Sequence, residues 1–352
     1  MNKKVQPILS IIIISHEQCE LLRRCLDSIL AMQINYPYEI IISDDRSTDG
    51  TYELAQQYAA DVLKGKISRN GLVRIVACQC NSDDCNPATT SQRSGWNRCN
   101  GYKYVQGKYM AYVDADDYFL DGAEVYHKQI ELLEQHPECS CCMSNLYEVD
   151  EGKTDLRQRH DPQAYPTGRI ITNEEFVRDN CFIESNVFMY RRNLKHNPVI
   201  LYGKLYVDSI ITYHHLQFGS IICLDQTDYV YVQYPKSISN QMIQSQDIAV
   251  VWCLPLLVPS VIPYWHAIMY RHNLKTILSV VEMSRHGYKL RDNNRNSLEA
   301  YNSYILHTFN RILTRYDKLR IRIIMKLIRL MIKYNRTSNF EMWILFQLLN
   351  VE

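Results

Sequence analysis

Three carboxylates follow directly on an apolar segment in the middle of this chain. Residues 109–113 are apolar and of strand length, and Asp114, Asp116 and Asp117 come next. Two Asp separated by one residue can point to the same side of an extended backbone. Such a pair suits a hard divalent cation, which prefers oxygen ligands and often keeps phosphate oxygens as partners. A solvated acidic turn or a helix cap is the alternative explanation of Asp114 and Asp116, whereas Asp117 is expected to cap the segment that follows.

A second acidic turn follows another apolar run. Residues 38–42 predict a strand, and the sequence then passes through Asp44 and Asp45 into a run of Ser, Thr, Asp and Gly that ends at Thr51. Carboxylates at a strand end can accept hydrogen bonds from a ligand, because ligands of open α/β sheets bind outside the carboxyl ends of the strands. The alternative is an Asx turn that caps the helix beginning at Thr51, since these residue types suit turns and caps. Both explanations can hold at once.

Strands and helices alternate around these turns. Residues 8–14 are a continuous apolar run, typical of a parallel strand covered on both faces. Apolar residues then recur at helical spacing from Leu21 to Leu30, and residues 51–60 predict a second helix. A short third strand is predicted at residues 73–77. This alternation indicates right-handed parallel crossovers, and therefore an α/β fold.

These motifs, taken in order, resemble the family 2 glycosyltransferases of the GT-A fold, a large group that builds bacterial surface polysaccharides. The resemblance covers residues 8 to 240. It rests on the opening strand and helix (residues 9–13 with Leu22, Leu26 and Ser28), the turn Ser43–Thr51, the run from Arg98 through Gly101, Gly107 and Tyr109 to Asp117, the later motif Tyr206–Asp208, and Tyr234 with Ser237–Asn240. Each motif alone is modest, but five in the right order are specific.

The resemblance implies a Rossmann-like, mostly parallel sheet flanked by helices in residues 1–240, followed by a mainly helical C-terminal region in residues 241–352. It also implies an inverting, metal-dependent glycosyltransferase. This enzyme would move a sugar from a nucleotide-diphosphate sugar, with UDP as the expected nucleotide, to a hydroxyl of a glycan or lipid-linked saccharide acceptor in cell-surface polysaccharide synthesis. A non-catalytic nucleotide-sugar-binding or structural homologue in an assembly complex is the alternative. A nucleotidyltransferase would want a Gly-rich, basic phosphate loop after the first strand, and residues 15–18 provide neither.

The resemblance gives the acidic residues separate roles. Asp114 is expected to face the ribose and Asp116 to bind Mn²⁺ or Mg²⁺, with Asp114 nearby as a second ligand and Ala115 in contact with the nucleotide sugar. The ion would act as a Lewis acid that neutralises charge on the departing diphosphate. Asp208 is expected to be the general base that takes the proton of the acceptor hydroxyl opposite the leaving group. A helix is predicted just after Asp208, so an N-cap is the alternative explanation of this residue.

The nucleotide is expected to bind at the first two strand ends. The resemblance assigns the turn containing Asp44 and Asp45 to the base, where a carboxylate can accept from uracil N3–H or a ribose hydroxyl, and Asp45 is the first choice. Ser15 and Glu17 are expected to contact the nucleotide sugar. Arg98 is expected to contact the nucleotide or the diphosphate, unless it is a surface arginine of an amphipathic helix. Glu17 stands where the family usually has Asn, which leaves the identity of the donor open.

The composition is that of a protein with a sizeable core rather than of a polyanion-binding protein. Hydrophobic residues make up 46% and charged residues 22% of the 352 residues, and the formal net charge is only +1, so no binding of nucleic acid is expected. Twelve cysteines occur without a signal peptide, which indicates reduced thiols and a cytoplasmic location. The cysteines at 78–85 and at 139–142 lack the two paired Cys-x-x-Cys of a zinc site, so they are expected to be buried as small hydrophobes.

The C-terminal region contains a basic stripe. Residues 301–352 hold nine Lys or Arg against three acids, and seven of the basic residues recur at spacings of four and three from Arg311 to Lys333. That spacing places them on one face of a helix. A basic amphipathic helix suits an anionic bilayer, so residues 311–333 are expected to hold the protein on the inner face of the cell membrane; an ordinary helix packed on the catalytic domain is the alternative. Residues 248–263 are apolar but contain three prolines, so no membrane-spanning helix is expected there.

Overall fold

The computed structural model describes residues 5–80, 90–172, 175–176, 184–192, 211–212, 215–216, 218–234 and 326. The chain divides into two compact units, one formed by Met1–Asn173 with Phe182–Asn240 and the other by Glu174–Cys181 with Gln241–Glu352. The basic stripe lies outside the described residues, apart from Lys326. Within the described part of the chain, no helix combines the length and the apolar character that a membrane crossing requires.

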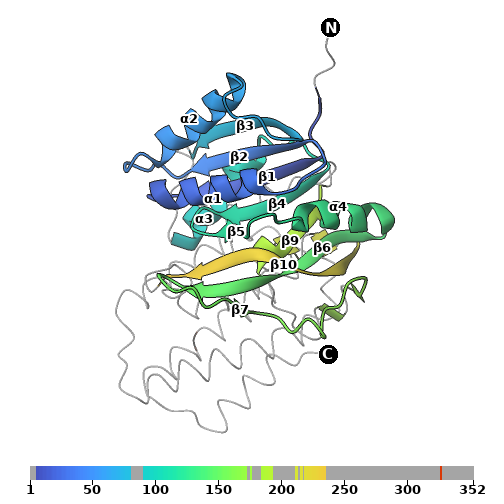
Figure 1. Ribbon diagram of the computed structural model, residues 1–352. Helices are drawn as coiled ribbons and strands as arrows, with labels where there is room; N and C mark the ends of the chain where they lie inside the picture. Colours follow the sequence, from blue (N-terminus) through green and yellow to red (C-terminus); the bar gives the residue numbers. More distant parts are fainter. Residues whose placement is uncertain are drawn as a thin grey trace, which may run out of the picture. The chain divides into compact units, whose positions relative to one another are not determined.

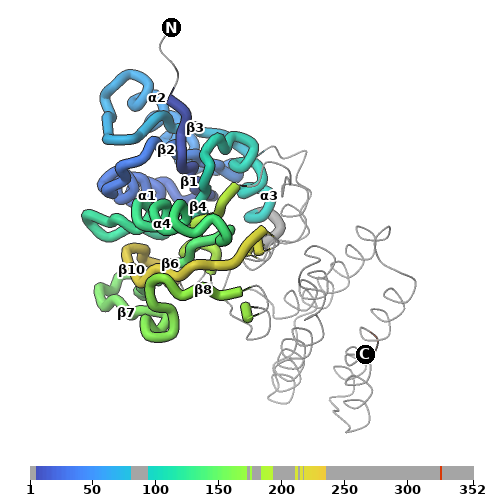
Figure 2. The backbone as a smooth tube through the Cα atoms, turned by 90° about the vertical axis from the view of Figure 1, so that its right-hand side faces the viewer, coloured from blue at the N-terminus to red at the C-terminus, as the bar shows by residue number. Residues whose placement is uncertain are grey.

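The first half of the sheet is built from strands and intervening helices that alternate as the sequence predicts. Its elements are β1 (Leu9–Ser15), α1 (Cys19–Ala31), β2 (Tyr38–Asp44), α2 (Thr51–Leu63), β3 (Leu72–Gln79), α3 (Thr90–Tyr102) and β4 (Tyr109–Asp114). The strands lie in the order β3-β2-β1-β4, and all neighbours are parallel. Figure 2 shows α1 and α2 on one side of these strands and α3 on the other.

Packing against helices on both sides explains the continuous apolar runs. Every residue of β1 and β2 is buried, as expected for parallel strands covered on both faces. The stripe that α1 buries comprises Leu22, Cys25, Leu26, Ile29 and Leu30, as predicted, whereas Leu21, at the start of the predicted stripe, is half-buried. α3 lies so close to β1 that a Cβ atom on Gly101 would be 2.7 Å from the Ile12 side chain. Close packing of the helix on the strand therefore requires the glycine at position 101.

The second half of the sheet mixes parallel and antiparallel strands. Its elements are β5 (Tyr118–Phe119), α4 (Val125–Gln135), β6 (Cys139–Asp150), β7 (Arg157–Gln158), β8 (Ile170–Ile171), the 3₁₀ helix η1 (Ser185–Val187), β9 (Phe188–Arg191) and β10 (Ser220–Gln233). The order continues from β4 through β9, β6 and β10 to β5, with β7 on β6 and β8 on β10. β9 is antiparallel to both β4 and β6, whereas β6 and β10 are parallel. The predicted α/β fold is confirmed, and β9 forms an antiparallel seam between the two halves (Figure 1).

The cysteines with described positions are free thiols, and all except Cys19 are buried. Burial raises the pKa of the Cys141 thiol to about 12. Among the described residues, no group of three or more His, Cys, Asp or Glu side chains could hold a metal ion by itself. The interpretation of the described cysteines as small buried hydrophobes agrees with their burial, and Cys85 lies outside the described residues.

Candidate functional site

The register of the parallel strands brings the predicted residues to one edge of the sheet. Ser15 of β1 is paired with Asp44 of β2, and Ile14 with Asp114 of β4. The buried Ala115 continues this pairing, since its N–H donates to the Ile14 main-chain oxygen 3.1 Å away. The carboxyl ends of the three strands are therefore level. An open α/β sheet binds its ligand at this edge.

The turns that follow β1 and β2, residues 15–18 and 44–51, are hydrogen bonded to each other, and we call them the paired turns. The Glu17 N–H donates to Ser47 Oγ at 2.8 Å. The Glu17 carboxylate accepts from the N–H and the hydroxyl of Thr48 at 2.8 and 3.1 Å. Glu17 adopts a left-handed backbone conformation with φ 54°, which is uncommon for a residue other than glycine. In the structure Glu17 therefore fixes the paired turns, and its predicted contact with a nucleotide sugar stays a prediction.

The two acids that end β2 have different environments. Asp44 is fully buried, and its carboxylate accepts from the Ser47 N–H at 2.9 Å, from the Ser47 hydroxyl, and from the Ser15 hydroxyl at 3.4 Å. These contacts join the turn after β2 to β1, so Asp44 organises the paired turns, whereas the Asx turn before α2 is made by Asp49, which accepts from the Thr51 N–H at 3.0 Å. Asp45 is also buried, with its carboxylate 3.9 Å from the Arg46 guanidinium. The contact with the base that the sequence suggests for Asp45 remains a prediction.

Arg98 lies beside the first acid of the acidic turn, which comprises residues 114–117. Its side chain is 2% exposed, and its Nη2 donates to Asp114 Oδ1 at 2.8 Å. The guanidinium lies 5.1 Å from the centre of the Tyr112 ring. The alternative of a surface arginine is therefore wrong. The second Asp114 oxygen, Oδ2, accepts from Asn186 Nδ2 at 2.8 Å, so the protein orients both oxygens of a carboxylate that is still 27% exposed.

Asp116 is partly buried next to Asp114. Burial raises the pKa of its carboxyl to about 6, and the negative charge of Asp114 adds to the rise. Arg24 of α1 donates to the main-chain oxygen of Asp116 and, at 3.4 Å, to the Tyr234 hydroxyl, and its guanidinium lies 4.7 Å from the centre of the Tyr118 ring. A divalent cation would fit these two acids, because its charge favours the ionised form of the Asp116 carboxyl over the protonated form that burial favours.

Asp117 does not cap the following segment, contrary to the expectation from the sequence. Its side chain is fully buried and accepts from the Tyr229 hydroxyl and, at 2.9 Å, from the Val232 N–H of β10. Burial and the charges of the two neighbouring acids raise the pKa of the Asp117 carboxyl well above its ordinary value. The start of α4 is capped instead by Asp228, whose carboxylate accepts two main-chain N–H groups at 2.8 and 2.9 Å. Asp117 thus joins the acidic turn to β10.

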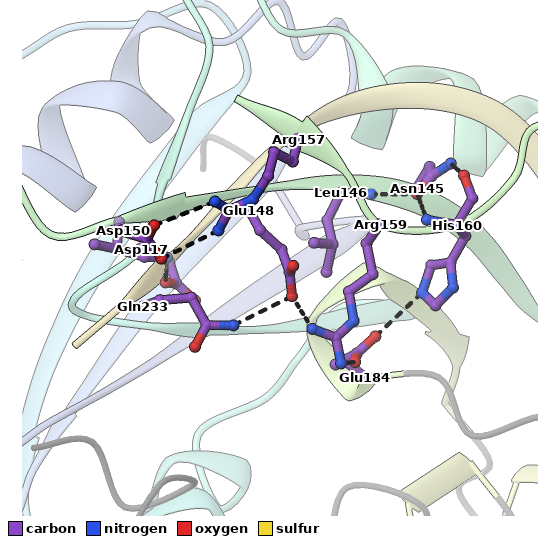
Figure 3. A network of polar contacts seen from close by, with 11 residues as sticks. Asp117, Asn145, Leu146, Glu148, Asp150, Arg157, Arg159, His160, Glu184 and Gln233 are labelled. Atoms are coloured by element: carbon purple, nitrogen blue, oxygen red, sulfur yellow. Dashed lines mark hydrogen bonds and ion pairs between the residues drawn. The ribbon is translucent and has the colours of Figure 1, made fainter. Parts of the chain in front are cut away.

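A chain of polar contacts that the sequence did not indicate crosses β6 and the loop after it (Figure 3). We call it the Glu184 network; its members are Glu148, Arg159, His160, Glu184 and Gln233. Arg159 pairs with Glu148 and, at 2.6 Å, with Glu184, which His160 Nε2 contacts at 3.2 Å. Gln233 Nε2 donates to Glu148 at 3.2 Å. Burial opposes ionisation of Glu184, but the His160 hydrogen bond and the Arg159 charge hold its pKa below the ordinary value.

The structure places eight predicted site residues at or beside one edge of the sheet. They are Ser15, Glu17, Asp44, Asp45, Arg98, Asp114, Ala115 and Asp116. Asp208 lies outside the described residues, so its role as a general base stays a prediction. Sequence reasoning missed Arg24 and Asn186, which both contact the acidic turn. The sequence does not distinguish Arg24 from the other polar residues of an amphipathic helix, and Asn186 lies in a segment without a periodic pattern.

Comparison with known proteins gives one family and several relatives. The sequence profile of glycosyl transferase family 2 matches residues 10–197. The uncharacterized protein Rv1520 of Mycobacterium tuberculosis is 28% identical over 233 residues, which are 65% of this chain and 60% of that protein. The uncharacterized glycosyltransferase EpsJ of Bacillus subtilis is 22% identical over 245 residues, 66% of this chain and 63% of that protein. The chain thus matches about three fifths of the length of these relatives.

Solved structures show the same fold. The crystal structure of S. aureus TarS residues 1–349 aligns with a TM-score of 0.56 and 15% identity, covering 94% of this chain and 93% of that one. The structure of the same TarS fragment in complex with UDP-GlcNAc aligns with a TM-score of 0.57 and 14% identity, again over 94% and 93% of the two chains. At this level of identity the likeness concerns the fold alone.

Proposed function

Because this chain belongs to glycosyl transferase family 2, we propose that it transfers a sugar from a nucleotide-diphosphate sugar to a hydroxyl group of an acceptor. The observation that carries the proposal is the level register of β1, β2 and β4, which sets Ser15, Asp44 and Asp114 along one edge of the sheet. A nucleotide needs groups for its base, ribose and diphosphate at such an edge. The paired turns and the acidic turn supply polar groups for all three.

The donor is proposed to be UDP-linked. The complex of TarS with UDP-GlcNAc supports this choice, since that protein shares the fold. The paired turns would receive the base, with Asp45 as the acceptor of a base or ribose hydrogen bond. Asp114 would face the ribose, as the family resemblance implies, and Arg98 and Asn186 already fix the direction of its carboxylate. No reorientation of this side chain is then needed when the donor binds.

Asp116, with Asp114 beside it, is proposed to hold Mn²⁺ or Mg²⁺. The two acids fit a hard cation, and Asp117 is engaged by β10, so the remaining coordination positions would be filled by oxygens of the donor or of water. When bound, the ion supplies neutralisation of the charge that develops on the diphosphate. Arg24 holds the main chain of Asp116 in place, and Arg98 balances the charge of Asp114.

The acceptor is proposed to be a glycan or a lipid-linked saccharide of a cell-surface polysaccharide. Asp208 would take the proton of its hydroxyl as that oxygen attacks the anomeric carbon, and a base opposite the leaving group gives inversion of configuration. The basic stripe of residues 311–333 would hold the protein on an anionic membrane surface, where lipid-linked acceptors are found. Both Asp208 and the stripe are proposed from the sequence.

A donor panel tests the proposal. The full chain is incubated with UDP and GDP sugars, with and without Mn²⁺, and release of the nucleotide is measured. Asp116→Ala should abolish release, because the remaining Asp114 cannot hold both ion and diphosphate. Asp61→Ala is the matched control, since Asp61 lies on α2 and pairs with Lys66 away from the strand ends. Full activity of Asp116→Ala in EDTA, or no release and no nucleotide binding by the wild type, would refute the proposal.

A further inference from the structure

One side-chain amide lies between two acids of the acidic turn. Asn186 is the middle residue of η1 and is buried. Its Nδ2 donates to Asp114 Oδ2 at 2.8 Å and lies 3.5 Å from Asp117 Oδ2. An amide carries no charge and has two N–H groups, so it can serve two carboxylates without adding to their repulsion. Neither a carboxylate nor an apolar side chain would do both.

The consequence for Asp114 is that each of its oxygens has a different protein donor. Arg98 holds Oδ1 from α3, and Asn186 holds Oδ2 from η1, each at 2.8 Å. Without Asn186, the side chain would keep the Arg98 contact but could turn about it, because Asp114 is 27% exposed. The plane of this carboxylate is therefore set by two donors, one that precedes Asp114 in the sequence and one that follows it.

η1 is itself fixed on both flanks. On one flank, Glu184 pairs with Arg159 at 2.6 Å and contacts His160 at 3.2 Å (Figure 3). On the other flank, the Val187 main-chain oxygen accepts from Gln129 Nε2 at 3.0 Å and from the Ser144 hydroxyl at 3.2 Å. These contacts come from α4, β6 and the segment after β7. They hold the backbone that carries Asn186 against the rest of the unit.

We propose that Asn186 is a positioning residue for the donor site: it sets the orientation of Asp114, and the Glu184 network holds Asn186 in place. The proposal rests on the proposed function, since Asp114 is taken to face the nucleotide sugar. Within the Glu184 network, Arg159 is a residue that would act on Asn186 only through Glu184. It bridges Glu148 and Glu184, its ion pairs join it to these two acids and not to the acidic turn, and its side chain is 36% exposed.

Calorimetric titration of the full chain with UDP in the presence of Mn²⁺ tests the proposal. Asn186→Leu keeps the approximate shape and removes both donors, so we expect UDP affinity to fall about tenfold or more, as for loss of a hydrogen bond to a charged group. Arg159→Met should weaken UDP binding less, by about threefold, and Arg159→Lys should fall between Met and wild type, because lysine keeps the charge but cannot bridge two carboxylates as a guanidinium does.

A role in folding alone gives a different result. Asp228→Ala is the control, since it removes the cap of α4 and should lower the melting temperature without changing UDP affinity. If Asn186→Leu does not fold, the exposed Arg159 variants carry the test. Wild-type UDP affinity in folded Asn186→Leu, or in Arg159→Met when Asn186→Leu is unfolded, would overturn the positioning role. A wild-type protein that binds no nucleotide with Mn²⁺ would overturn the proposed function itself, and the positioning role with it.

Discussion

Replacement of Asp117 tests whether this buried carboxyl stabilises the fold rather than binds a ligand. Asp117→Ala leaves two buried donors of β10, the Val232 N–H and the Tyr229 hydroxyl, without their acceptor. An unsatisfied buried donor costs about 1–3 kcal/mol. The tyrosine hydroxyl can rotate toward another partner, so we expect a total loss of about 2–4 kcal/mol. For a unit of this size, each kcal/mol lowers the melting temperature by about 2–4 °C, which gives a fall of about 10 °C.

Asp117→Asn should behave differently, because an amide oxygen can still accept from Val232 N–H and the tyrosine hydroxyl can accept from the amide. The raised pKa of Asp117 means that the folded state holds this proton more tightly than the unfolded state does. That contribution to stability is present below the ordinary Asp pKa and is lost as the pH rises through the raised value. The stability of Asp117→Asn relative to the wild type should therefore increase with pH.

Urea and thermal unfolding of the wild type and the two variants, followed by circular dichroism at several pH values, measure these differences. If the free energy of unfolding of Asp117→Ala lies within about 1 kcal/mol of the wild-type value, Asp117 is not the link between the acidic turn and β10. If Asp117→Asn is as damaging as Asp117→Ala at every pH, the carboxyl acts as a charged group and the argument from burial is wrong.

Four further results are expected. UDP binding with Mn²⁺ should weaken about tenfold per pH unit below about pH 6, because the ion needs the ionised Asp116 carboxylate, whose pKa burial raises to about 6; isotherms with a pH-independent affinity would contradict this. Arg24→Met should weaken UDP binding by about fivefold with little change in melting temperature, since it loses hydrogen bonds worth about 1 kcal/mol at an exposed side chain; unchanged affinity would show that Arg24 does not support the turn. Asp208→Asn should lower kcat about 10² or more while the donor KM changes little, and loss of donor binding at a normal rate would make Asp208 structural. Charge reversal of the basic residues in 311–333 should release the protein from anionic vesicles but spare transfer to a soluble acceptor, since each charge contributes about 1 kcal/mol; equal vesicle binding by both proteins would show a packed helix.

The parallel half of the sheet could be predicted because its signals are local. The apolar runs of β1 and β2 and the stripe of α1 each lie within a dozen or so residues, and the periods of strand and helix differ. The positions of Ser15, Asp44 and Asp114 at one edge then follow from parallel pairing. No such pattern predicts β9, which has four residues and lies in the middle of the sheet, antiparallel to β4 and β6.

The partners of the acids could not be predicted, because they are distant in the sequence. Asp117 was expected to cap the segment that follows it, but its β10 donors lie 112 and 115 residues further along. Arg98 could be either exposed or buried on an amphipathic helix, and only the packing of α3 on β1 decides it. Asn186 is one amide in a segment without periodicity, and its importance depends entirely on the two carboxylates beside it.

The long reach of Asp117 bears on the order in which the molecule assembles during synthesis. Once residue 114 has been synthesised, the chain contains all of β1, β2, β3 and β4, and the paired turns use only residues from that stretch. The acidic turn is complete only when β10 has paired with β6 and has brought Tyr229 and Val232 to Asp117. A nascent chain that ends before β10 therefore lacks both β10 donors of Asp117, although Arg24 and Arg98 are already present to hold Asp116 and Asp114. We expect the last acid of the turn to be fixed late, at the single step in which β10 pairs with β6.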